Sequence, residues 1–330
     1  MAVETLDFFF NHEYAKLYEN IDGASDTFFL ECEHGKIQHT FILREIKWSL
    51  GGKTYYDIVT PYGYGGPIIL ECTDILKLME AYRKAFAEYC SEHNIICEFI
   101  RFHLFDNVDF RENYYGETQR MLDNVVVNTT GAYDDIWMRY EHKVRKNVKK
   151  AQSNGLEMIV ENDLSRLDDF LRIYYGTMER NNAKQYYYFK RGYFEDIARR
   201  IPQNFMYFHV IKDDSVISTE LVLFSDKYAY SFLGGTVESA YSVRPNDFLK
   251  DAIIKWCNET GREIFVLGGG YRKDDGIYKY KRSFTDSPDV PFYIGKSIFD
   301  RKIYDEMVSL RAAEDKDFDR ESAYFPLYRA

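Results

Sequence analysis

The chain has 330 residues, about the length of two domains, and a formal net charge of −10. This acidic balance argues against a generic nucleic-acid coat protein or a protein of the membrane surface. Five cysteines without a CxxC pair, no apolar stretch long enough to cross a bilayer and no signal-peptide layout predict a reduced, cytoplasmic protein without integral membrane association.

The first half of the chain predicts alternating strands and a helix. The patterns indicate two strands joined by a turn over 28–46, a strand entering a glycine-rich loop over 55–70, a helix over 75–94 and a strand over 95–105. The apolar stripe of that helix comprises Leu76, Met79, Tyr82, Ala85, Phe86 and Tyr89. Because a strand, a helix and a strand follow one another, we expect a right-handed crossover and a largely parallel strand pair.

The second half repeats this plan after a basic helix that ends at Asn154–Gly155. We predict a strand over 156–162, a helix over 164–183, a three-stranded meander over 205–235, a helix opened by Pro245 over 246–261 and a strand over 262–270. The predicted fold class is α/β (α+β), with two domains that are each a mixed β-sheet flanked by helices. The expected boundaries are 1–133 for the first domain, 134–155 for a basic connecting helix and 156–330 for the second domain.

A proline-bracketed loop, Pro-Tyr-Gly-Tyr-Gly-Gly-Pro, spans residues 61–67 after a predicted strand. Gly65 and Gly66 could let backbone amides approach a ligand, and Tyr62 and Tyr64 add flat faces with polar ends. Composition alone favours the other interpretation, a rigid turn. The spacing matches neither GxGxxG nor the Walker pattern, so it carries no nucleotide fingerprint.

The basic helix is conspicuous in an acidic chain. Its cations, with Arg139 before them, are Lys143, Arg145, Lys146, Lys149 and Lys150. Such a cluster could bind the phosphates of a nucleotide, a lipid-linked sugar or a tRNA. A solvated helix face is the alternative that stays open.

A glycine triplet, Gly268, Gly269 and Gly270, ends the last predicted strand, and Lys279, Lys281 and Arg282 follow it. Ligands of open α/β sheets gather at the carboxyl ends of strands, and glycines there let a substrate lie against the backbone. Because acyl transfer develops negative charge on a carbonyl oxygen, a desolvated cation at this place would stabilise it. A glycine-rich loop with a surface basic run would look the same.

Glu220 lies within an apolar predicted strand. A carboxylate in that setting could be a base with a raised pKa, although an exposed strand face or a pair with a nearby lysine is the more ordinary interpretation. The sequence has no HExxH, CxxC or His/Cys cluster at metal-ligand spacing, so we predict no metal site.

Taken in order, these segments resemble the Fem-type peptidoglycan-bridge aminoacyltransferases of the GNAT acetyltransferase superfamily. The matching pieces cover most of the chain and read TPYGYGGP, HKVRKNVKKAQSNG, TMERNNAKQYYYF, FLGG, PNDFLKDAIIKWCNETG and VLGGGYRKDDGIYKYKRSF. The resemblance implies two GNAT-like domains with a cleft between them. It also implies transfer of an amino acid from aminoacyl-tRNA to an amine of a peptidoglycan precursor.

Individual roles follow from the same resemblance. The aromatic–lysine pair that lies at the reacting ester in this family corresponds to Tyr280 and Lys281, with Lys281 as the cation that stabilises the oxyanion. The family's aromatic is more often phenylalanine, so Tyr280 departs from the pattern. The substrate-binding positions implied for the acceptor side are Arg180, Asn181, Tyr187 and Lys190, and the loop of the first half contributes Tyr62 and Tyr64.

The segment before the helix of the second half departs from the superfamily pattern, and this bears on the identity of the acyl donor. GNAT enzymes that use acetyl-CoA usually carry Q/R-x-x-G-x-G/A before the helix of the second half, whereas this chain has YSVRPNDFL. Asn246 can still offer a helix N-terminus to a ligand, but the charge of Asp247 makes it a poor phosphate site. We therefore expect no tightly bound cofactor and either aminoacyl-tRNA or acyl-CoA as co-substrate, with acetyl-CoA disfavoured by the missing glycines.

Two alternatives remain at this point. One is an acyl-CoA-dependent N-acyltransferase that acts on a small amine or sugar. The other is a non-catalytic protein that binds a peptide or glycan.

Overall fold

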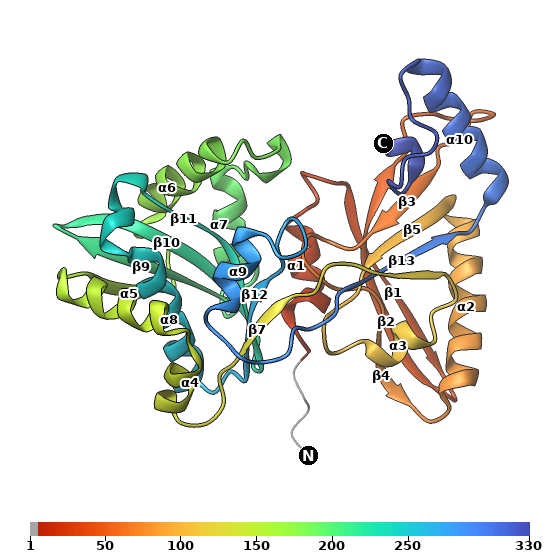
Figure 1. Ribbon diagram of the computed structural model, residues 1–330. Coiled ribbons are helices and arrows are strands. Elements are labelled where there is room, and N and C mark those ends of the chain that lie inside the picture. Colours follow the sequence, from red (N-terminus) through yellow and green to blue (C-terminus); the bar gives the residue numbers. More distant parts are fainter. Residues whose placement is uncertain (1–5) are drawn as a thin grey trace. The chain divides into compact units, whose positions relative to one another are not determined.

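The computed structural model describes residues 6–330, which form two compact units. Unit 1 comprises residues 6–8 and Leu122–Val290, and unit 2 comprises Phe9–Met121 and Pro291–Ala330. Each unit is a mixed sheet with helices packed against it, as the sequence predicts (Figure 1). Among the described residues, no helix is both long and apolar enough to pass through a bilayer.

The sheet of unit 1 contains the predicted meander. Its strands lie in the order β7 (Val125–Asn128), β12 (Ile264–Gly268), β11 (Tyr228–Thr236), β10 (Ser215–Phe224), β9 (Phe205–Lys212) and β8 (Glu157–Glu161). Neighbouring strands are antiparallel except β11 and β12, which are parallel. A parallel neighbour requires a crossover, and helix α8 supplies it.

Helices cover both faces of this sheet. They are α4 (Tyr133–Arg139), α5 (His142–Ser153), α6 (Leu167–Arg180), α7 (Arg191–Arg200), α8 (Pro245–Glu259) and α9 (Gly276–Arg282), with 3-10 turns η2 (Gln185–Tyr187) and η3 (Glu238–Val243). Successive residues of β9 show the two layers: Tyr207 contacts Phe170 of α6, and Phe208 contacts Trp256 of α8.

Unit 2 is built on a second mixed sheet. Its strands are β1 (Ala24–Cys32), β2 (Gly35–Glu45), β3 (Tyr56–Val59), β5 (Ile95–Arg101), β13 (Tyr293–Ile298) and β6 (Glu117–Arg120) in that order, and β4 (Ile68–Cys72) also pairs with β2. Its helices are α1 (His12–Lys16), α2 (Ile75–Glu92), α3 (Val108–Glu112) and α10 (Arg301–Glu314), with turns η1 (Phe8–Phe10) and η4 (Leu327–Arg329). The predicted parallel pair is β3 and β5, and α2 lies between them along the chain.

The core stripe of α2 differs from the predicted stripe, because Leu78 and Cys90 are buried and were not predicted, while Leu76 was predicted and is exposed. Met79, Tyr82 and Phe86 are buried, whereas Leu76 is 71% exposed. Asp74 caps the helix by accepting a hydrogen bond from the Lys77 N–H, so Leu76 lies in the first turn, before the stripe meets the sheet.

The chain divides differently from the predicted boundaries. Strand β13 pairs with β5 and β6, so the last forty residues complete the sheet of unit 2 instead of ending the second domain. The basic segment 134–155 is not a connector, because α5 buries Val144, Val148 and Ala151 in the core of unit 1. Strand pairing between residues far apart in sequence leaves no local signal, which explains the difference.

Burial of a histidine in unit 1 predicts acid sensitivity. The His209 ring is 1% exposed, its Nδ1 lies 2.9 Å from Thr219 Oγ1, and burial, with Arg166 adding positive charge, lowers its pKa to about 4. Between pH 6.5 and 4 the unfolded chain therefore binds a proton that the folded chain does not, and stability falls by about 1.4 kcal/mol per pH unit from this group. In denaturant unfolding, acidification to pH 4 should lower the free energy of unfolding by about 3 kcal/mol less in His209→Asn than in the wild type. The exposed His142→Asn control should leave the profile unchanged, and an equal effect of both substitutions would contradict the assignment.

Candidate active site

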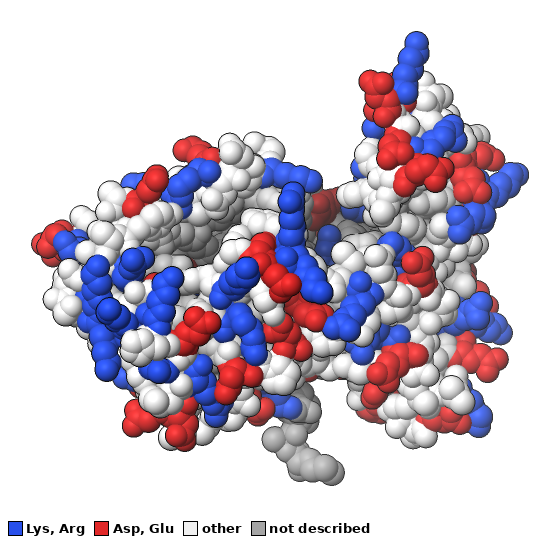
Figure 2. All heavy atoms as spheres, in the orientation of Figure 1, with Lys and Arg blue, Asp and Glu red and all other residues white. Residues whose placement is uncertain are grey.

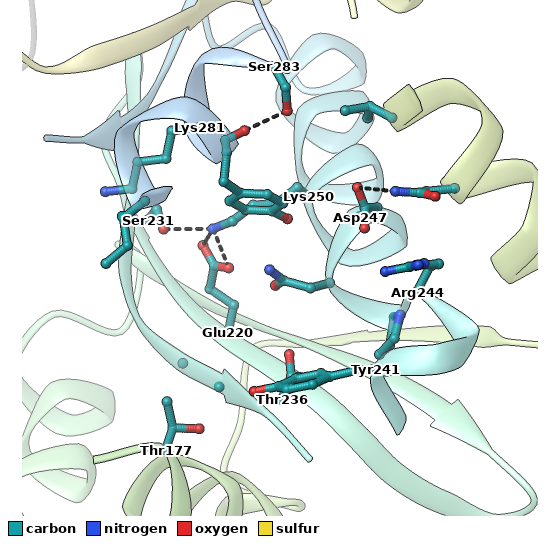
Figure 3. A pocket seen from close by; sticks show the side chains of 18 of the residues that line it. Thr177, Glu220, Ser231, Thr236, Tyr241, Arg244, Asp247, Lys250, Lys281 and Ser283 are labelled. Carbon is teal, nitrogen blue, oxygen red and sulfur yellow. Dashed lines mark hydrogen bonds and ion pairs between the residues drawn. The ribbon is translucent and has the colours of Figure 1, made fainter. Parts of the chain in front are cut away.

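A pocket of about 970 Å³ lies in unit 1. Its walls come from β10, β11, the N-terminal turns of α5 and α8, the end of α6, and α9. Figure 3 shows its labelled side chains, with Lys250 directed at Glu220 and Ser231, and Lys281 close to this group.

The pocket forms where β11 and β12 separate. Their pairing covers only Tyr228–Tyr230 and Ile264–Val266, while β11 continues to Thr236. Residues Phe232–Thr236 line the pocket with their backbone, and Gly234 and Gly235 have no room for a side chain, because a Cβ would lie 2.4 Å from Thr219 O and 2.1 Å from Thr177 Oγ1, respectively. Close packing of β10 and α6 therefore requires glycine at these two positions.

Lys281 projects from α9 into this pocket. Its Nζ donates a hydrogen bond of 2.7 Å to the carbonyl oxygen of Gly269. A Cβ on Gly268 would lie 3.3 Å from the same Nζ, so the glycine strand end admits the lysine. Burial, then the positive charge of Lys250, lowers the pKa of Lys281 to about 8, against an opposing effect of Glu220.

A buried ion pair forms the floor beside Lys281. Lys250 Nζ lies 2.6 and 2.5 Å from the two Glu220 carboxylate oxygens and 2.8 Å from Ser231 Oγ. Glu220 and Lys250 are 5% and 7% exposed. Of the two ordinary interpretations of Glu220, the pair with a lysine is confirmed and the exposed strand face is wrong.

The first turn of α8 supplies polar groups on another wall. Pro245 is the first residue of the helix, as predicted, and Asn246 and Asp247 follow it into the pocket. Asp247 accepts a 3.2 Å hydrogen bond from Asn147 Nδ2, and burial raises the pKa of its carboxyl. Tyr280 lies beside them, and burial raises the pKa of its hydroxyl.

Arg180 marks the rim at the end of α6. It donates hydrogen bonds of 3.3 Å to the Thr236 carbonyl and to Thr177 Oγ1, and its guanidinium lies 5.6 Å from the Tyr241 ring centre. A planar cation held in this way keeps other N–H groups for a ligand.

The structure groups five of the residues predicted from sequence around this pocket: Lys143, Arg180, Asn246, Tyr280 and Lys281. The glycine triplet does not line the pocket but positions residues that shape it. Gly269 anchors Lys281, and Gly270 makes room for Asp275, which caps α9 by accepting a 2.7 Å hydrogen bond from the Tyr278 N–H. Asn181, Tyr187 and Lys190 follow α6 and do not line this pocket.

The predicted loop of the first half belongs to unit 2 and makes internal contacts there. The Tyr62 carbonyl accepts a 2.7 Å hydrogen bond from the Tyr14 hydroxyl, and the Tyr64 ring packs on Phe9 and Phe292. Gly65 and Gly66 are buried, and the Gly65 carbonyl accepts a 2.7 Å hydrogen bond from Asn107 Nδ2. These contacts are those of a rigid turn.

The cations of α5 take different positions. Lys143 lines the pocket, whereas Lys146, Lys149 and Lys150 are exposed, and Figure 2 shows Lys and Arg gathered over this helix. Arg145 donates hydrogen bonds to the carbonyls of Met138 and Tyr140 and so closes the end of α4. Arg145 therefore has structural partners at the end of α4.

Sequence reasoning missed Lys250, Ser231 and Tyr241 as lining residues. Lys250 carried a usable signal, because it lies on the apolar stripe of α8, next to Leu249 and four residues before Ile254. A lysine on a buried helix face requires a partner, and Glu220 on an apolar strand was available. Ser231 and Tyr241 carried no comparable signal.

Known proteins are similar to this chain in sequence and in fold. The family model described as an acetyltransferase (GNAT) domain matches residues 138–282, which contain most of the pocket. A curated protein, the UDP-N-acetylmuramoylpentapeptide-lysine N(6)-alanyltransferase of Weissella viridescens, is 26% identical over 183 residues. The match covers 51% of this chain and spans about half the length of that relative.

Solved structures show the fold over the whole chain. A FemX crystal structure matches with a TM-score of 0.68 at 13% identity, covering 91% of this chain and 96% of that one. The C-terminal domain of a putative lysylphosphatidylglycerol synthetase from Agrobacterium fabrum matches with a TM-score of 0.54 at 14% identity, covering 92% and 91%. Residues 138–282 therefore match the GNAT acetyltransferase domain family, and the chain as a whole has the fold of the FemX structure.

Proposed function

We propose that the protein transfers an aminoacyl group from aminoacyl-tRNA to an amine of a cell-wall (peptidoglycan) precursor in the cytoplasm. The observation that carries this proposal is Lys281, a half-buried lysine with a lowered pKa in the pocket of the unit that matches the GNAT domain. The relative named as an alanyltransferase of UDP-N-acetylmuramoylpentapeptide-lysine supports an aminoacyl group as the group transferred and a cell-wall precursor amine as the acceptor.

The proposed chemistry needs no covalent enzyme intermediate. The neutral acceptor amine attacks the ester carbonyl, a C–N bond forms, and the carbonyl oxygen becomes negative. The ammonium of Lys281 stabilises that oxygen, and the ester C–O bond then breaks while the amine proton passes to the leaving ribose oxygen. Lys281 is protonated below pH about 8, so it supplies this charge at neutral pH.

The first turn of α8 favours aminoacyl-tRNA over acyl-CoA as the donor. Asp247 places a carboxylate in the first turn of α8, where a phosphate would otherwise meet the helix N-terminus. Lys143 and Arg244 remain exposed on the rim and could contact a phosphate farther out. Acyl-CoA transfer to a small amine or sugar is the competing function.

A donor exchange assay tests the proposal. The purified protein is incubated with UDP-N-acetylmuramoyl-pentapeptide and either alanyl-tRNA or acetyl-CoA, and the product is weighed by mass spectrometry. We expect an added alanyl residue with the first donor and no acetyl group with the second. Acetylation without alanylation would establish the competing function, and no product with a panel of aminoacyl-tRNAs and amine acceptors would support a non-catalytic binding protein.

A further inference from the structure

Asp247 is a buried carboxylate that the surrounding protein neutralises poorly. Asp247 is 9% exposed. Within residues 6–330 its carboxylate accepts a hydrogen bond from one other side chain, that of Asn147, at 3.2 Å. Arg244 and Lys143 act on it through their charge, but both are exposed and neither donates a hydrogen bond to it within the described chain. An ionised carboxylate can accept more bonds than this, and burial makes an added cation favourable.

The Tyr280 hydroxyl lies near that carboxylate and has a similar deficit. It is buried and makes no hydrogen bond of normal geometry within the described part of the chain. The ring is fixed by an edge contact with Phe284 at 5.3 Å. Tyr280 lines the same pocket as Asn246 and Asp247, and burial, then the charges of Asp247 and Glu220, raise the pKa of its hydroxyl, against an opposing effect of the Asn246 side chain. A buried hydroxyl without a partner costs free energy unless a ligand or water supplies one.

The lysines on the other side of the pocket already have partners. Lys250 is neutralised by Glu220, and Lys281 donates to the Gly269 carbonyl. In Figure 3, Asp247 lies apart from Lys281 and the Glu220–Lys250 pair. The pocket thus offers an oxyanion-stabilising cation at one place and unfilled acceptors at another.

We propose that Asp247, Asn246 and the Tyr280 hydroxyl form a subsite for a primary ammonium group of a substrate, an inference that rests on the proposed function for the identity of that substrate. An ammonium has N–H donors in three directions and no acceptor, which matches a carboxylate, an amide oxygen and a phenolic oxygen. An aminoacyl ester carries its α-ammonium directly beside the carbonyl, so its carbonyl oxygen faces Lys281 while its ammonium faces Asp247. The acyl group of acetyl-CoA offers no such cation. The protonated acceptor amine is the other source of the same group.

Binding measurements with matched ligand pairs test the subsite without requiring turnover. The donor pair is 3′-alanylamido-3′-deoxyadenosine and its propionyl counterpart, which lacks the ammonium. The acceptor pair is UDP-N-acetylmuramoyl-pentapeptide with a free lysine amine and the same compound acetylated on that amine. By calorimetry, we expect the wild type to prefer the ammonium member of one pair by about ten-fold or more, because a removed charge partner leaves the carboxylate unpaired.

Substitutions in the subsite test whether the preference for the ammonium ligand depends on these side chains. Asp247→Asn and Tyr280→Phe should reduce that preference to less than about three-fold, while affinity for the neutral member changes little. The matched controls are Asp251→Asn, one turn later on α8 with its carboxylate bonded to Tyr133, and Tyr278→Phe on α9, bonded to Asp289; both lie outside the pocket and should keep the preference.

The pair that responds identifies the source, donor or acceptor. A preference below three-fold in both wild-type pairs, or one that survives Asp247→Asn, would overturn the subsite. Because these are binding data, the subsite can fail while the alanyl transfer succeeds, and it can stand while that transfer fails.

Discussion

Replacing Lys281 by methionine is expected to lower kcat/KM for aminoacyl transfer by about 10²- to 10³-fold or more, the loss typical of removing one stabilising group from a developing oxyanion. Methionine keeps the length of the side chain and removes the charge that the Gly269 carbonyl holds in place. The fold should be retained, since Lys281 is only half-buried and contributes no core contact. Steady-state kinetics with the transferred amino acid as readout measure the effect.

The pH dependence separates a charge effect from a packing effect. Because the pKa of Lys281 is about 8, its cationic form is lost as the pH rises through 8, and the wild-type kcat/KM should fall there. Lys281→Arg keeps the charge at every accessible pH, so this falling limb should disappear from its residual activity. The exposed Lys255→Met control should show wild-type kinetics. Near-normal activity of Lys281→Met would refute the assigned role.

Breaking the Glu220–Lys250 pair is expected to cost about 3–5 kcal/mol of unfolding free energy, because each single substitution leaves an unpaired charge in the interior. Glu220→Gln removes the carboxylate that accepts both short contacts from Lys250, and Lys250→Met leaves Glu220 without its cation. Urea unfolding followed by tryptophan fluorescence measures the loss, and Trp256 of α8 reports on unit 1.

The double variant and a surface pair make this prediction specific. Glu220→Gln with Lys250→Met removes both charges and should be more stable than either single variant, with a coupling energy of about 2–3 kcal/mol. The matched control is the exposed pair Lys255–Glu259 on the same helix, at 3.7 Å, where Glu259→Gln should change stability by less than about 0.5 kcal/mol. Additive losses at the buried pair would contradict the proposed pairing energetics.

Several features of the site could be predicted from local signals. Pro245 opens α8 because its missing N–H is harmless at the first helical position. The glycine triplet and the cations after it pointed to the end of β12, where Lys281 lies. The resemblance added the role of Lys281, which composition and spacing left undecided.

Other features depend on contacts between distant residues. Glu220 and Lys250 are 30 residues apart and meet only because β10 and α8 pack together. The loop 61–67 had the composition of a ligand loop, yet Tyr62 and Tyr64 are engaged by Tyr14 and Phe9 within unit 2. Composition cannot distinguish a binding loop from a packed turn, because both need glycine and proline.

By itself, the sequence determined the α/β class, the parallel β3–β5 pair, the meander and the starts of α2 and α8, because these follow from periodicity, caps and turns within short windows. The basic segment expected as one helix over 134–155 forms two, α4 and α5. Tertiary structure alone decided that β13 returns to the sheet of unit 2 and that β11 and β12 separate to open the pocket. It also decided that Asp247 and Tyr280 line the same pocket, where the Tyr280 hydroxyl has no hydrogen-bond partner among the described residues. The physical reason is that strand pairing and burial join residues far apart along the chain, and the free energy of those contacts depends on partners that no local pattern identifies.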